Sequence, residues 1–213
     1  MSAPLFRQAK FLKSVADLPG LPGESAREIA FAGRSNSGKS SVINTLADQR
    51  QLARVSKTPG RTQLINFFAL GDGRFLVDLP GYGYAKVPAA TRAPWGRLIG
   101  EYLQIRAQLA GLALVMDVRH PLTQLDWGLL DWFAPTGKPV HVLLTKADKL
   151  SRQVALKTLR EVRSTLAETS SNWTAQLFSS LKHTGIDDAH AVLCAWLAAE
   201  MSETTDQLGP AAA

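Results

Sequence analysis

The feature that most constrains this chain is a glycine-rich loop between an apolar run and a helical pattern. Residues 33–40 read Gly-Arg-Ser-Asn-Ser-Gly-Lys-Ser, which matches the pattern G-x-x-x-x-G-K-[ST]. The apolar run at 29–32 predicts a strand before the loop, and a helical pattern begins at Lys39. Small residues let backbone N–H groups curl around a phosphate, and the helix N-terminus adds positive potential. The predicted phosphate-binding residues are Gly33, Arg34, Ser35, Asn36, Ser37, Gly38, Lys39 and Ser40.

Short apolar runs alternate with helical patterns along the rest of the chain. Strands are predicted at 28–32, 64–69, 75–78, 112–117, 140–145 and 175–178, and helices at 39–47, 93–109, 123–133, 151–168 and 187–201. Gly71-Asp72-Gly73 predicts a hairpin turn between the second and third strands. The alternation predicts an α/β fold of three layers, with helices flanking a mostly parallel six-stranded sheet that has one antiparallel edge strand. Ligands of such sheets bind beyond the carboxyl ends of the strands.

The composition is that of one compact domain: 213 residues, of which 46% are hydrophobic and 20% charged. We expect the domain at 24–201, a basic extension with a Pro/Gly connector at 1–23, and a flexible tail at 202–213. The only cysteine, Cys194, excludes an internal disulfide, and its apolar surroundings predict a small buried side chain. No apolar run reaches about 18 residues and no secretory leader is recognisable. We therefore expect a cytoplasmic monomer without a membrane span.

Positive charge is concentrated in the first part of the chain. Residues 1–62 contain ten basic and four acidic residues, and the remainder is neutral, giving a net charge of +6. This asymmetry predicts a polyanionic partner or ligand. A solvated basic face without a partner is the alternative.

A second motif, Asp-Leu-Pro-Gly at 78–81, follows the apolar run at 75–77. An aspartate at a strand end can hold Mg²⁺ through water, and a glycine can offer its N–H to a γ-phosphate. Lys39 would then reach the β- and γ-phosphates, and Ser40 would ligate Mg²⁺. An ordinary strand-to-turn junction is the alternative. The predicted nucleotide contacts here are Asp78, Leu79, Pro80 and Gly81.

A third motif, Thr-Lys-Ala-Asp at 145–148, can distinguish guanine from adenine. The carboxylate of Asp148 can accept hydrogen bonds from N1–H and N2–H of guanine, a pattern that adenine cannot satisfy. The alkyl stem of Lys146 can cover the base, and backbone N–H groups at 179–182 could meet the guanine O6. Polar turns are the alternative for each segment alone. The predicted base-site residues are Thr145, Lys146, Ala147, Asp148, Phe178, Ser179 and Ser180.

The segment 57–62, Lys-Thr-Pro-Gly-Arg-Thr, lies between the first predicted helix and the second strand. A threonine here can ligate Mg²⁺ and contact the γ-phosphate only in the triphosphate state. Thr62 is preferred over Thr58 because Pro59-Gly60 forms a bend and Thr62 enters the strand. The predicted contacts in this segment are Gly60, Arg61, Thr62, Gln63 and Leu64.

Taken together, these motifs resemble the translation-factor-type GTPases, and within them the EngB/YsxC (YihA) family of small bacterial GTP-binding proteins. The likeness runs from about residue 10 to about residue 196, and Thr145, where most GTPases carry asparagine, fits it. The resemblance implies a single G domain with GTP/GDP and Mg²⁺ as ligands, and slow GTP hydrolysis. It also implies a role in large ribosomal subunit assembly and in normal cell division and septation.

Hydrolysis in such a site depends on positioning and electrostatics, for which Lys39, Thr62 and Gly81 are the predicted catalytic residues. Tyr82 stands where Ras-like proteins place a water-orienting glutamine, so turnover should be slow. Arg61 could act as an arginine finger or contact phosphate, RNA or solvent. Asn36 could hold K⁺ beside the phosphates or only shape the loop.

The partner is less defined than the nucleotide. The aromatic and basic segment 82–88, together with Arg50, Arg54, Lys57, Arg61 and Arg92, could form an RNA-binding surface for the large ribosomal subunit. A flexible loop that packs its own tyrosines is the alternative. A GTP-dependent adaptor of the division machinery without a direct ribosome role is the second functional hypothesis. An ATP-dependent P-loop kinase is the third, and the motif at 145–148 argues against it.

Overall fold

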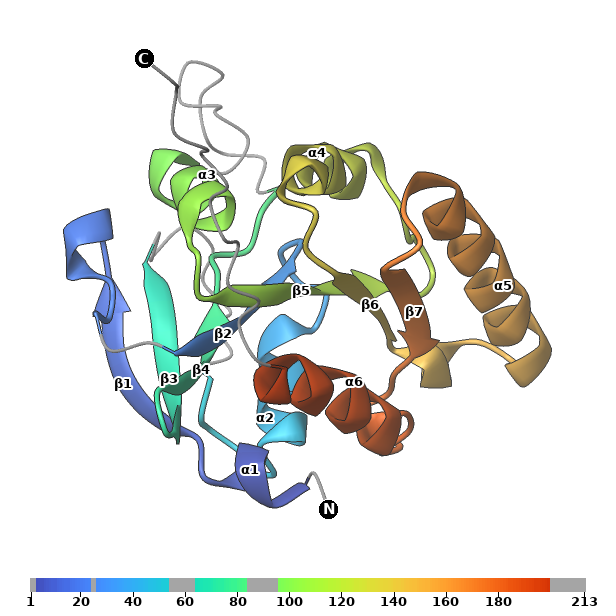
Figure 1. Ribbon diagram of the computed structural model, residues 1–213. Helices are drawn as coiled ribbons and strands as arrows, with labels where there is room; N and C mark the ends of the chain where they lie inside the picture. Colours follow the sequence, from blue (N-terminus) through green and yellow to red (C-terminus); the bar gives the residue numbers. More distant parts are fainter. Residues whose placement is uncertain (1–2, 24–25, 54–63, 84–95, 200–213) are drawn as a thin grey trace, which may run out of the picture.

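One sheet organises the chain in the computed structural model, which describes residues 3–23, 26–53, 64–83 and 96–199 (Figure 1). The strands are β1 (Lys10–Val15), β2 (Arg27–Gly33), β3 (Ile65–Gly71), β4 (Arg74–Asp78), β5 (Leu109–Asp117), β6 (Val140–Thr145) and β7 (Trp173–Leu177). Their order across the sheet is β1-β3-β4-β2-β5-β6-β7. β3 pairs antiparallel with both β1 and β4, and the remaining neighbours are parallel.

Helices cover both faces of this sheet. They are α1 (Ala3–Arg7), α2 (Lys39–Leu46), α3 (Gly96–Ile105), α4 (Gln124–Phe133), α5 (Arg152–Thr169) and α6 (Ile186–Ala198). One apolar cluster packs α3, α4 and α5 against one face, and a second packs α1, α2 and α6 against the other (Figure 1). The three-layer α/β architecture with a mostly parallel sheet is therefore confirmed.

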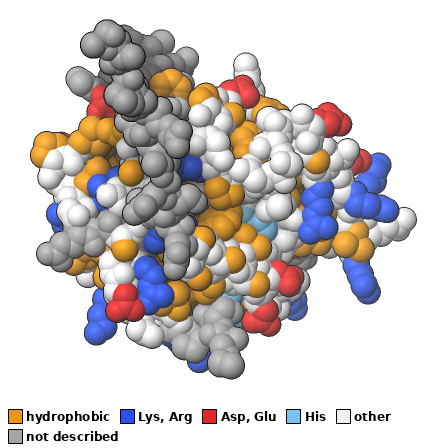
Figure 2. All heavy atoms as spheres, in the orientation of Figure 1, with side chains coloured by type: hydrophobic (Ala, Val, Ile, Leu, Met, Phe, Trp, Pro, Cys, Tyr) orange, Lys and Arg blue, Asp and Glu red, His pale blue; other side chains and the backbone are white. Residues whose placement is uncertain are grey.

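Burial explains why these segments take these structures. β6 is buried at all six positions, as expected for a parallel strand covered on both faces. α5 instead buries one stripe at helical spacing, consisting of Ala155, Leu159, Val162 and Leu166. Its other faces carry charge, and Figure 2 shows Lys and Arg side chains projecting on this side of the molecule.

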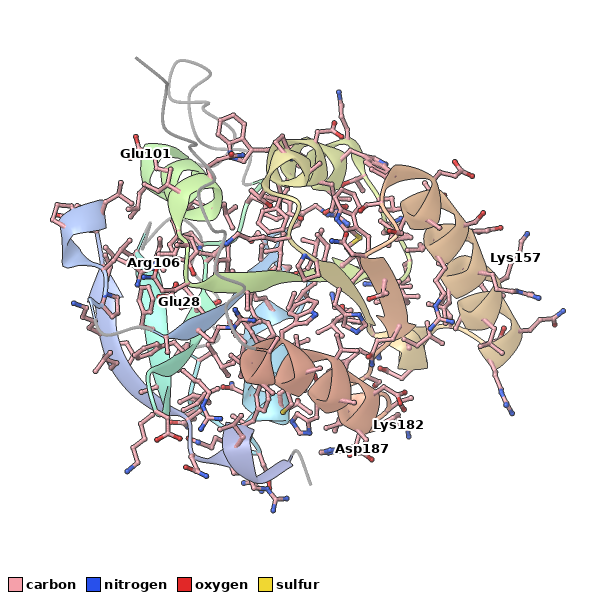
Figure 3. The ribbon with its side chains drawn as sticks, viewed as in Figure 1. Glu28, Glu101, Arg106, Lys157, Lys182 and Asp187 are labelled. Atoms are coloured by element: carbon pink, nitrogen blue, oxygen red, sulfur yellow. The ribbon has the colours of Figure 1, made fainter. Side chains whose placement is uncertain are left out.

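A buried ion pair and a hydrogen bond tie the centre of the sheet to α3 and to Arg106, the residue that follows it. Glu28 in β2 is fully buried and lies 2.6 Å from Arg106 Nη2, while the Tyr102 hydroxyl donates to it at 2.8 Å. Figure 3 shows Glu28 and Arg106 side by side between the sheet and the helix. The carboxylate and its partners satisfy one another, which a charge in this position requires.

The sheet has seven strands rather than the six expected, and its antiparallel strand β3 is not at the edge. The extra strand, β1, comes from the N-terminal extension and forms the edge beside β3. Five of its six residues are exposed. Because both faces of β1 are exposed, its sequence does not need the alternation of apolar and polar residues that marks a half-buried strand. Its register also shifts between Phe11 and Lys13. The boundaries of the predicted domain at 24–201 stay a prediction, and the tail at 202–213 lies outside the described residues.

Most of the other predicted elements are confirmed within a few residues. The hairpin between β3 and β4 turns through Gly71 and Gly73, which have φ values of 89° and 68°. Cys194 is partly rather than fully buried, at the margin of the second apolar cluster. Among the helices of the described ranges, none is long and apolar enough to cross a membrane. The parallel strands β2, β4, β5 and β6 end at the same edge of the sheet, where the predicted motifs follow them.

Candidate functional site

The predicted phosphate loop leaves the carboxyl end of β2 and leads directly into α2. A Cβ on Gly33 would lie 2.6 Å from Ser37 Oγ and 2.7 Å from the Val115 carbonyl oxygen, so only glycine fits there. Gly38, immediately before α2, has a φ of 98°, and Asn36 has a φ of 66°. These left-handed residues bend the chain back on itself, as a loop that wraps a small anion requires.

Lys39 and Asp78 meet at the mouth of this loop. Lys39 is the first residue of α2, Asp78 is the last residue of β4, and their side chains form an ion pair with about a tenth of each exposed. Ser40 follows Lys39 in the first helical turn. A serine hydroxyl and a carboxylate are the oxygen donors that Mg²⁺ prefers, so this donor set fits the predicted ion. The other predicted ligand, Thr62, lies outside the described residues.

The segment after β4 runs along the phosphate loop. The N–H of Tyr82 donates to the Gly33 carbonyl oxygen at 3.3 Å, and the N–H of Ser35 donates to the Tyr82 carbonyl oxygen at 2.9 Å. Gly81 is thereby held beside Ser35, and a Cβ built on Gly81 would lie 3.5 Å from the Ser35 backbone. That is an ordinary contact distance, so the packing of the protein itself does not demand glycine at this position.

The Tyr82 side chain turns into the core toward α4. Its hydroxyl donates to Asp126 Oδ1 at 2.7 Å, and only 6% of the residue is exposed. Burial raises the pKa of the phenol far above its usual value, and the Asp126 carboxylate adds to this rise. Asp126 also caps α4, accepting from the N–H and hydroxyl of Thr123, and forms an ion pair with Arg34 at 3.3 Å. Asp126 thus joins three parts of the molecule: the Tyr82 phenol after β4, the start of α4, and Arg34 of the phosphate loop.

The predicted base site forms where β6 and β7 end together. The Phe178 N–H donates to the Leu144 carbonyl oxygen at 2.8 Å, and the Ala147 N–H donates to the Phe178 carbonyl oxygen at 3.2 Å. This pairing brings Asp148 against Ser179, whose hydroxyl donates to Asp148 Oδ1 at 2.5 Å. That hydrogen bond lowers the pKa of the carboxyl, which favours the ionised, hydrogen-bond-accepting form.

A pocket of about 170 Å³ lies beside this pair. Thr145, Lys146 and Asp148 line one side, and Gly38 and Ser41 of the phosphate loop and α2 line another. Thr145 Oγ1 lies 2.5 Å from the Ser37 carbonyl oxygen and 3.0 Å from that of Met116, so this buried hydroxyl joins the two motifs. Phosphate loop and base site therefore form one continuous surface.

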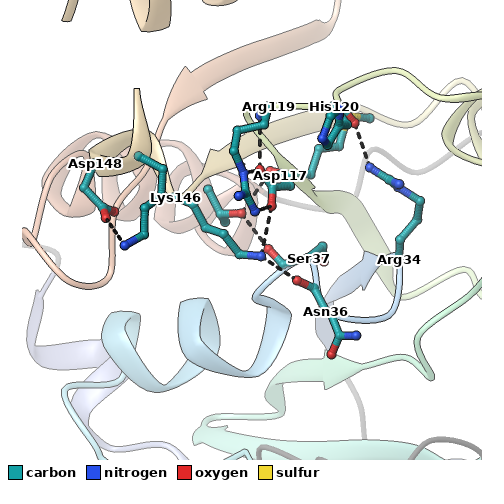
Figure 4. A network of polar contacts seen from close by, with 11 residues as sticks. Arg34, Asn36, Ser37, Asp117, Arg119, His120, Lys146 and Asp148 are labelled. Atoms are coloured by element: carbon teal, nitrogen blue, oxygen red, sulfur yellow. Dashed lines mark hydrogen bonds and ion pairs between the residues drawn. The ribbon is translucent and has the colours of Figure 1, made fainter. Parts of the chain in front are cut away.

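The side chain of Lys146 also reaches from the base site to the phosphate loop (Figure 4). Its ammonium donates to the Asn36 carbonyl oxygen at 2.8 Å and lies 2.9 Å from Asp117 Oδ2. Arg119 grips the same carboxylate through Nε at 2.9 Å and Nη2 at 2.7 Å. These bonds, first that from Arg119, lower the pKa of Asp117 well below its usual range.

The fold brings the described motifs at 33–40, 78–81, 145–148 and 178–180 to one edge of the sheet. Gly60, Arg61, Thr62 and Gln63 lie outside the described residues, and Leu64 is half-buried just before β3. Asp117 and Asp126 were not predicted from the sequence as site residues. Asp117 ends an apolar strand just as Asp78 does, and that signal could have identified it. Asp126 had a weaker signal, the capping pattern Thr-x-x-Asp at 123–126.

Comparison with known proteins agrees with this geometry. Residues 28–146 match a family model described as "50S ribosome-binding GTPase". A "Probable GTP-binding protein EngB" from Dechloromonas aromatica (strain RCB) is 56% identical over 209 residues, covering 97% of this chain and 94% of that protein. Its counterpart from Nitrosomonas europaea is 58% identical over 196 residues, covering 92% and 88%.

Solved structures share the fold at low sequence identity. The crystal structure of a probable GTP-binding protein engB has a TM-score of 0.63 at 20% identity, covering 80% of this chain and 98% of that one. Era in complex with MgGDPNP and a 16S ribosomal RNA fragment has a TM-score of 0.61 at 19% identity, covering 80% and 56%. By sequence identity along nearly its whole length, with a matching P-loop architecture, the chain belongs to the EngB family of GTP-binding proteins.

Proposed function

We propose that this chain is a slow, Mg²⁺-dependent GTPase that acts as a nucleotide switch in assembly of the large ribosomal subunit and is needed for normal cell division. The observation that carries the nucleotide part is the joined surface of phosphate loop and base pocket, with Asp148 held by Ser179. The ribosomal part is supported by the matched family's description and by the basic N-terminal region. Septation is proposed from the family resemblance alone.

In the proposed reaction the chain binds and positions, with little covalent chemistry of its own. Asp148 accepts the guanine N1–H and N2–H, the loop amides surround the phosphates, and Lys39 exchanges Asp78 for phosphate oxygens. Ser40 and Thr62 would hold Mg²⁺ directly and Asp78 would hold it through water; the bound ion would supply positive charge to the phosphate site. In this proposal the Gly81 N–H contacts the γ-phosphate.

Slow turnover is expected because Tyr82 stands where Ras-like proteins place a water-orienting glutamine. The Tyr82 hydroxyl is already donated to Asp126, so it does not orient an attacking water. Two groups could compensate, Arg61 as a finger and Asn36 as a ligand of K⁺; Asn36 is exposed at the turn of the loop. Rates measured in KCl and NaCl at equal ionic strength test the second, and equal rates would remove K⁺ from the proposal.

A surface beside β1 supports an RNA partner. Phe11 is 56% exposed and packs edge-on against Phe68, with ring centroids 6.0 Å apart. Lys10 and Arg50 line an open depression of about 600 Å³ next to it, and the described residues of its lining include no carboxylate. Exposed aromatic rings and cations suit nucleic acid through stacking and phosphate contacts.

Co-sedimentation with large-subunit particles tests the proposal at a stated salt concentration, because phosphate contacts weaken steeply as salt rises. We expect pelleting to differ between GTP-analogue and GDP states and to fall in a Lys10→Ala/Arg50→Ala double variant. A matched Lys157→Ala/Arg160→Ala variant on α5 should pellet like the unaltered protein. Equal or absent pelleting in both nucleotide states would favour the adaptor hypothesis.

A further inference from the structure

Asp117 lies between the two halves of the nucleotide site without belonging to either motif. It is the last residue of β5, which pairs with β2 before the phosphate loop and with β6 before the base motif. Its side chain is 11% exposed. Figure 4 shows the carboxylate facing Lys146 on one side and Arg119 on the other.

Three donors from Arg119 fix the orientation of this carboxylate. The backbone N–H and Nε of Arg119 donate to Oδ1 at 3.1 and 2.9 Å, and Nη2 donates to Oδ2 at 2.7 Å. A two-pronged guanidinium contact defines geometry as well as charge. Oδ2 is thereby presented to the Lys146 ammonium at 2.9 Å.

Lys146 in turn contacts both halves of the site. Its backbone has a φ of 57°, its side chain lines the base pocket, and its ammonium reaches the Asn36 carbonyl oxygen in the phosphate loop. A free lysine side chain has many rotamers, and fixing one of them costs entropy when a ligand binds. An anchored ammonium keeps the alkyl stem in one place before the base arrives.

We propose that Asp117 is a positioning residue for guanine-nucleotide binding. It holds the Lys146 ammonium against the phosphate loop, so that the stem of Lys146 is already placed against the base pocket. The proposal rests on GTP/GDP binding at this site. Because the contact concerns the base and the loop rather than the γ-phosphate, loss of Asp117 should weaken GDP and GTP binding equally.

The test is a double-mutant cycle on the dissociation rate of fluorescent mant-GDP and a mant-labelled GTP analogue. Asp117→Asn should speed dissociation of both by about tenfold, the lower end of what a hydrogen bond to a charged group contributes. Lys146→Met keeps the apolar stem but removes the ammonium. In that background Asp117→Asn should add less than about twofold, because coupled residues are not additive.

A matched control comes from the far end of the sheet. Asp72 also pairs with an arginine two residues on, Arg74, but it lies in the β3–β4 turn away from the carboxyl ends. Asp72→Asn should leave both dissociation rates unchanged. Asp117→Glu, which keeps the charge, should recover part of the slow dissociation that Asp117→Asn loses.

The outcomes separate the proposal from the function on which it rests. Unaltered protein that binds neither nucleotide would overturn the GTPase function itself. Unaltered protein that binds normally, with rates unchanged in Asp117→Asn or an equal change in both Lys146 backgrounds, would overturn the positioning role. If Asp117→Asn does not fold, Arg119→Met should speed release about threefold by freeing the carboxylate, and unchanged rates there would also overturn it.

Discussion

The base pocket and the mouth of the phosphate loop hold their charged groups in different ways. In the base pocket Asp148 is oriented by the hydroxyl of Ser179, and beside the pocket Asp117 is oriented by Arg119; in both cases the partner is not an expected nucleotide ligand. Lys39 and Asp78 instead neutralise each other directly, although each is expected to serve a ligand. We therefore expect the base pocket to be arranged before binding and the phosphate mouth to exchange partners during binding. Substitutions that remove a charge should accordingly lower nucleotide affinity most at the mouth of the phosphate loop.

The largest effect should follow from removing the cation at the mouth. Lys39→Met deletes the partner of Asp78 and leaves a nearly buried carboxylate facing the incoming phosphates. We expect GTP affinity to fall by about a thousandfold, because an unpaired buried charge adds its own penalty to the lost contact. Titration calorimetry measures this. Lys157→Met on exposed α5 is the control, and a loss below about tenfold would contradict the proposed exchange of partners.

The next largest effect tests the preformed pocket. Asp148→Asn should weaken GTP by about a hundredfold and bring a gain for xanthosine nucleotides, since the amide presents a donor where the carboxylate presented an acceptor. Competition of unlabelled purine nucleotides against mant-GDP gives the order of preference. If the unaltered protein failed to distinguish guanine from adenine nucleotides, the assignment of this pocket to the base would be wrong.

Gly81→Ala separates packing from ligand contact at the mouth. The added Cβ meets the Ser35 backbone at an ordinary 3.5 Å, so folding and GDP affinity should change less than about twofold. Hydrolysis should fall about tenfold because the methyl group crowds the γ-phosphate position. Single-turnover assays beside GDP titrations provide both numbers. Equal losses in GDP affinity and hydrolysis would show a general disturbance of the loop.

Lowering the pH should reduce the stability of the protein in part through protonation of Asp117, which lies beside the base pocket. Its folded pKa is depressed and an unfolded aspartate titrates near pH 3.9, so its stabilisation is present above about pH 4 and is lost as pH falls further. The unfolding free energy should therefore drop between pH 5 and pH 3, and drop less in Asp117→Asn. Urea unfolding at the two pH values measures the difference. Arg119→Met should flatten the dependence as well, and an unaltered slope in both variants would argue against the pair.

The smallest effect concerns Tyr82, which lies beside the mouth yet faces α4. Because its hydroxyl serves Asp126, Tyr82→Ala should change basal hydrolysis less than about threefold, in contrast to the general contribution of about 10²–10⁴-fold from acid–base groups. Tyr82→Phe keeps the ring in the core and controls for lost packing. A hundredfold loss in a single-turnover assay would make the phenol catalytic.

Local motifs were predictable from the sequence where spacing alone determines geometry. Gly33 and Gly38 stand at fixed offsets around one tight loop, so their strained or crowded backbone could be anticipated. The sequence did not indicate which residues of distant segments contact each other. Asp126 meets Tyr82 across 44 residues, and the link depends on how α4 packs on the sheet. β1 was missed because an exposed edge strand needs no apolar alternation.

The edge strand β1 also affects whether this sheet can pair with strands of other molecules. Among the described residues β1 pairs only with β3, so it forms an edge of the sheet, the position from which sheets of separate molecules fuse. Lys10, Lys13 and the slipped register between Phe11 and Lys13 make it a poor template for such fusion. Because β1 lies beside β3 at the end of the sheet, shortening the chain to its nucleotide-binding motifs would expose β3 as the edge strand in its place.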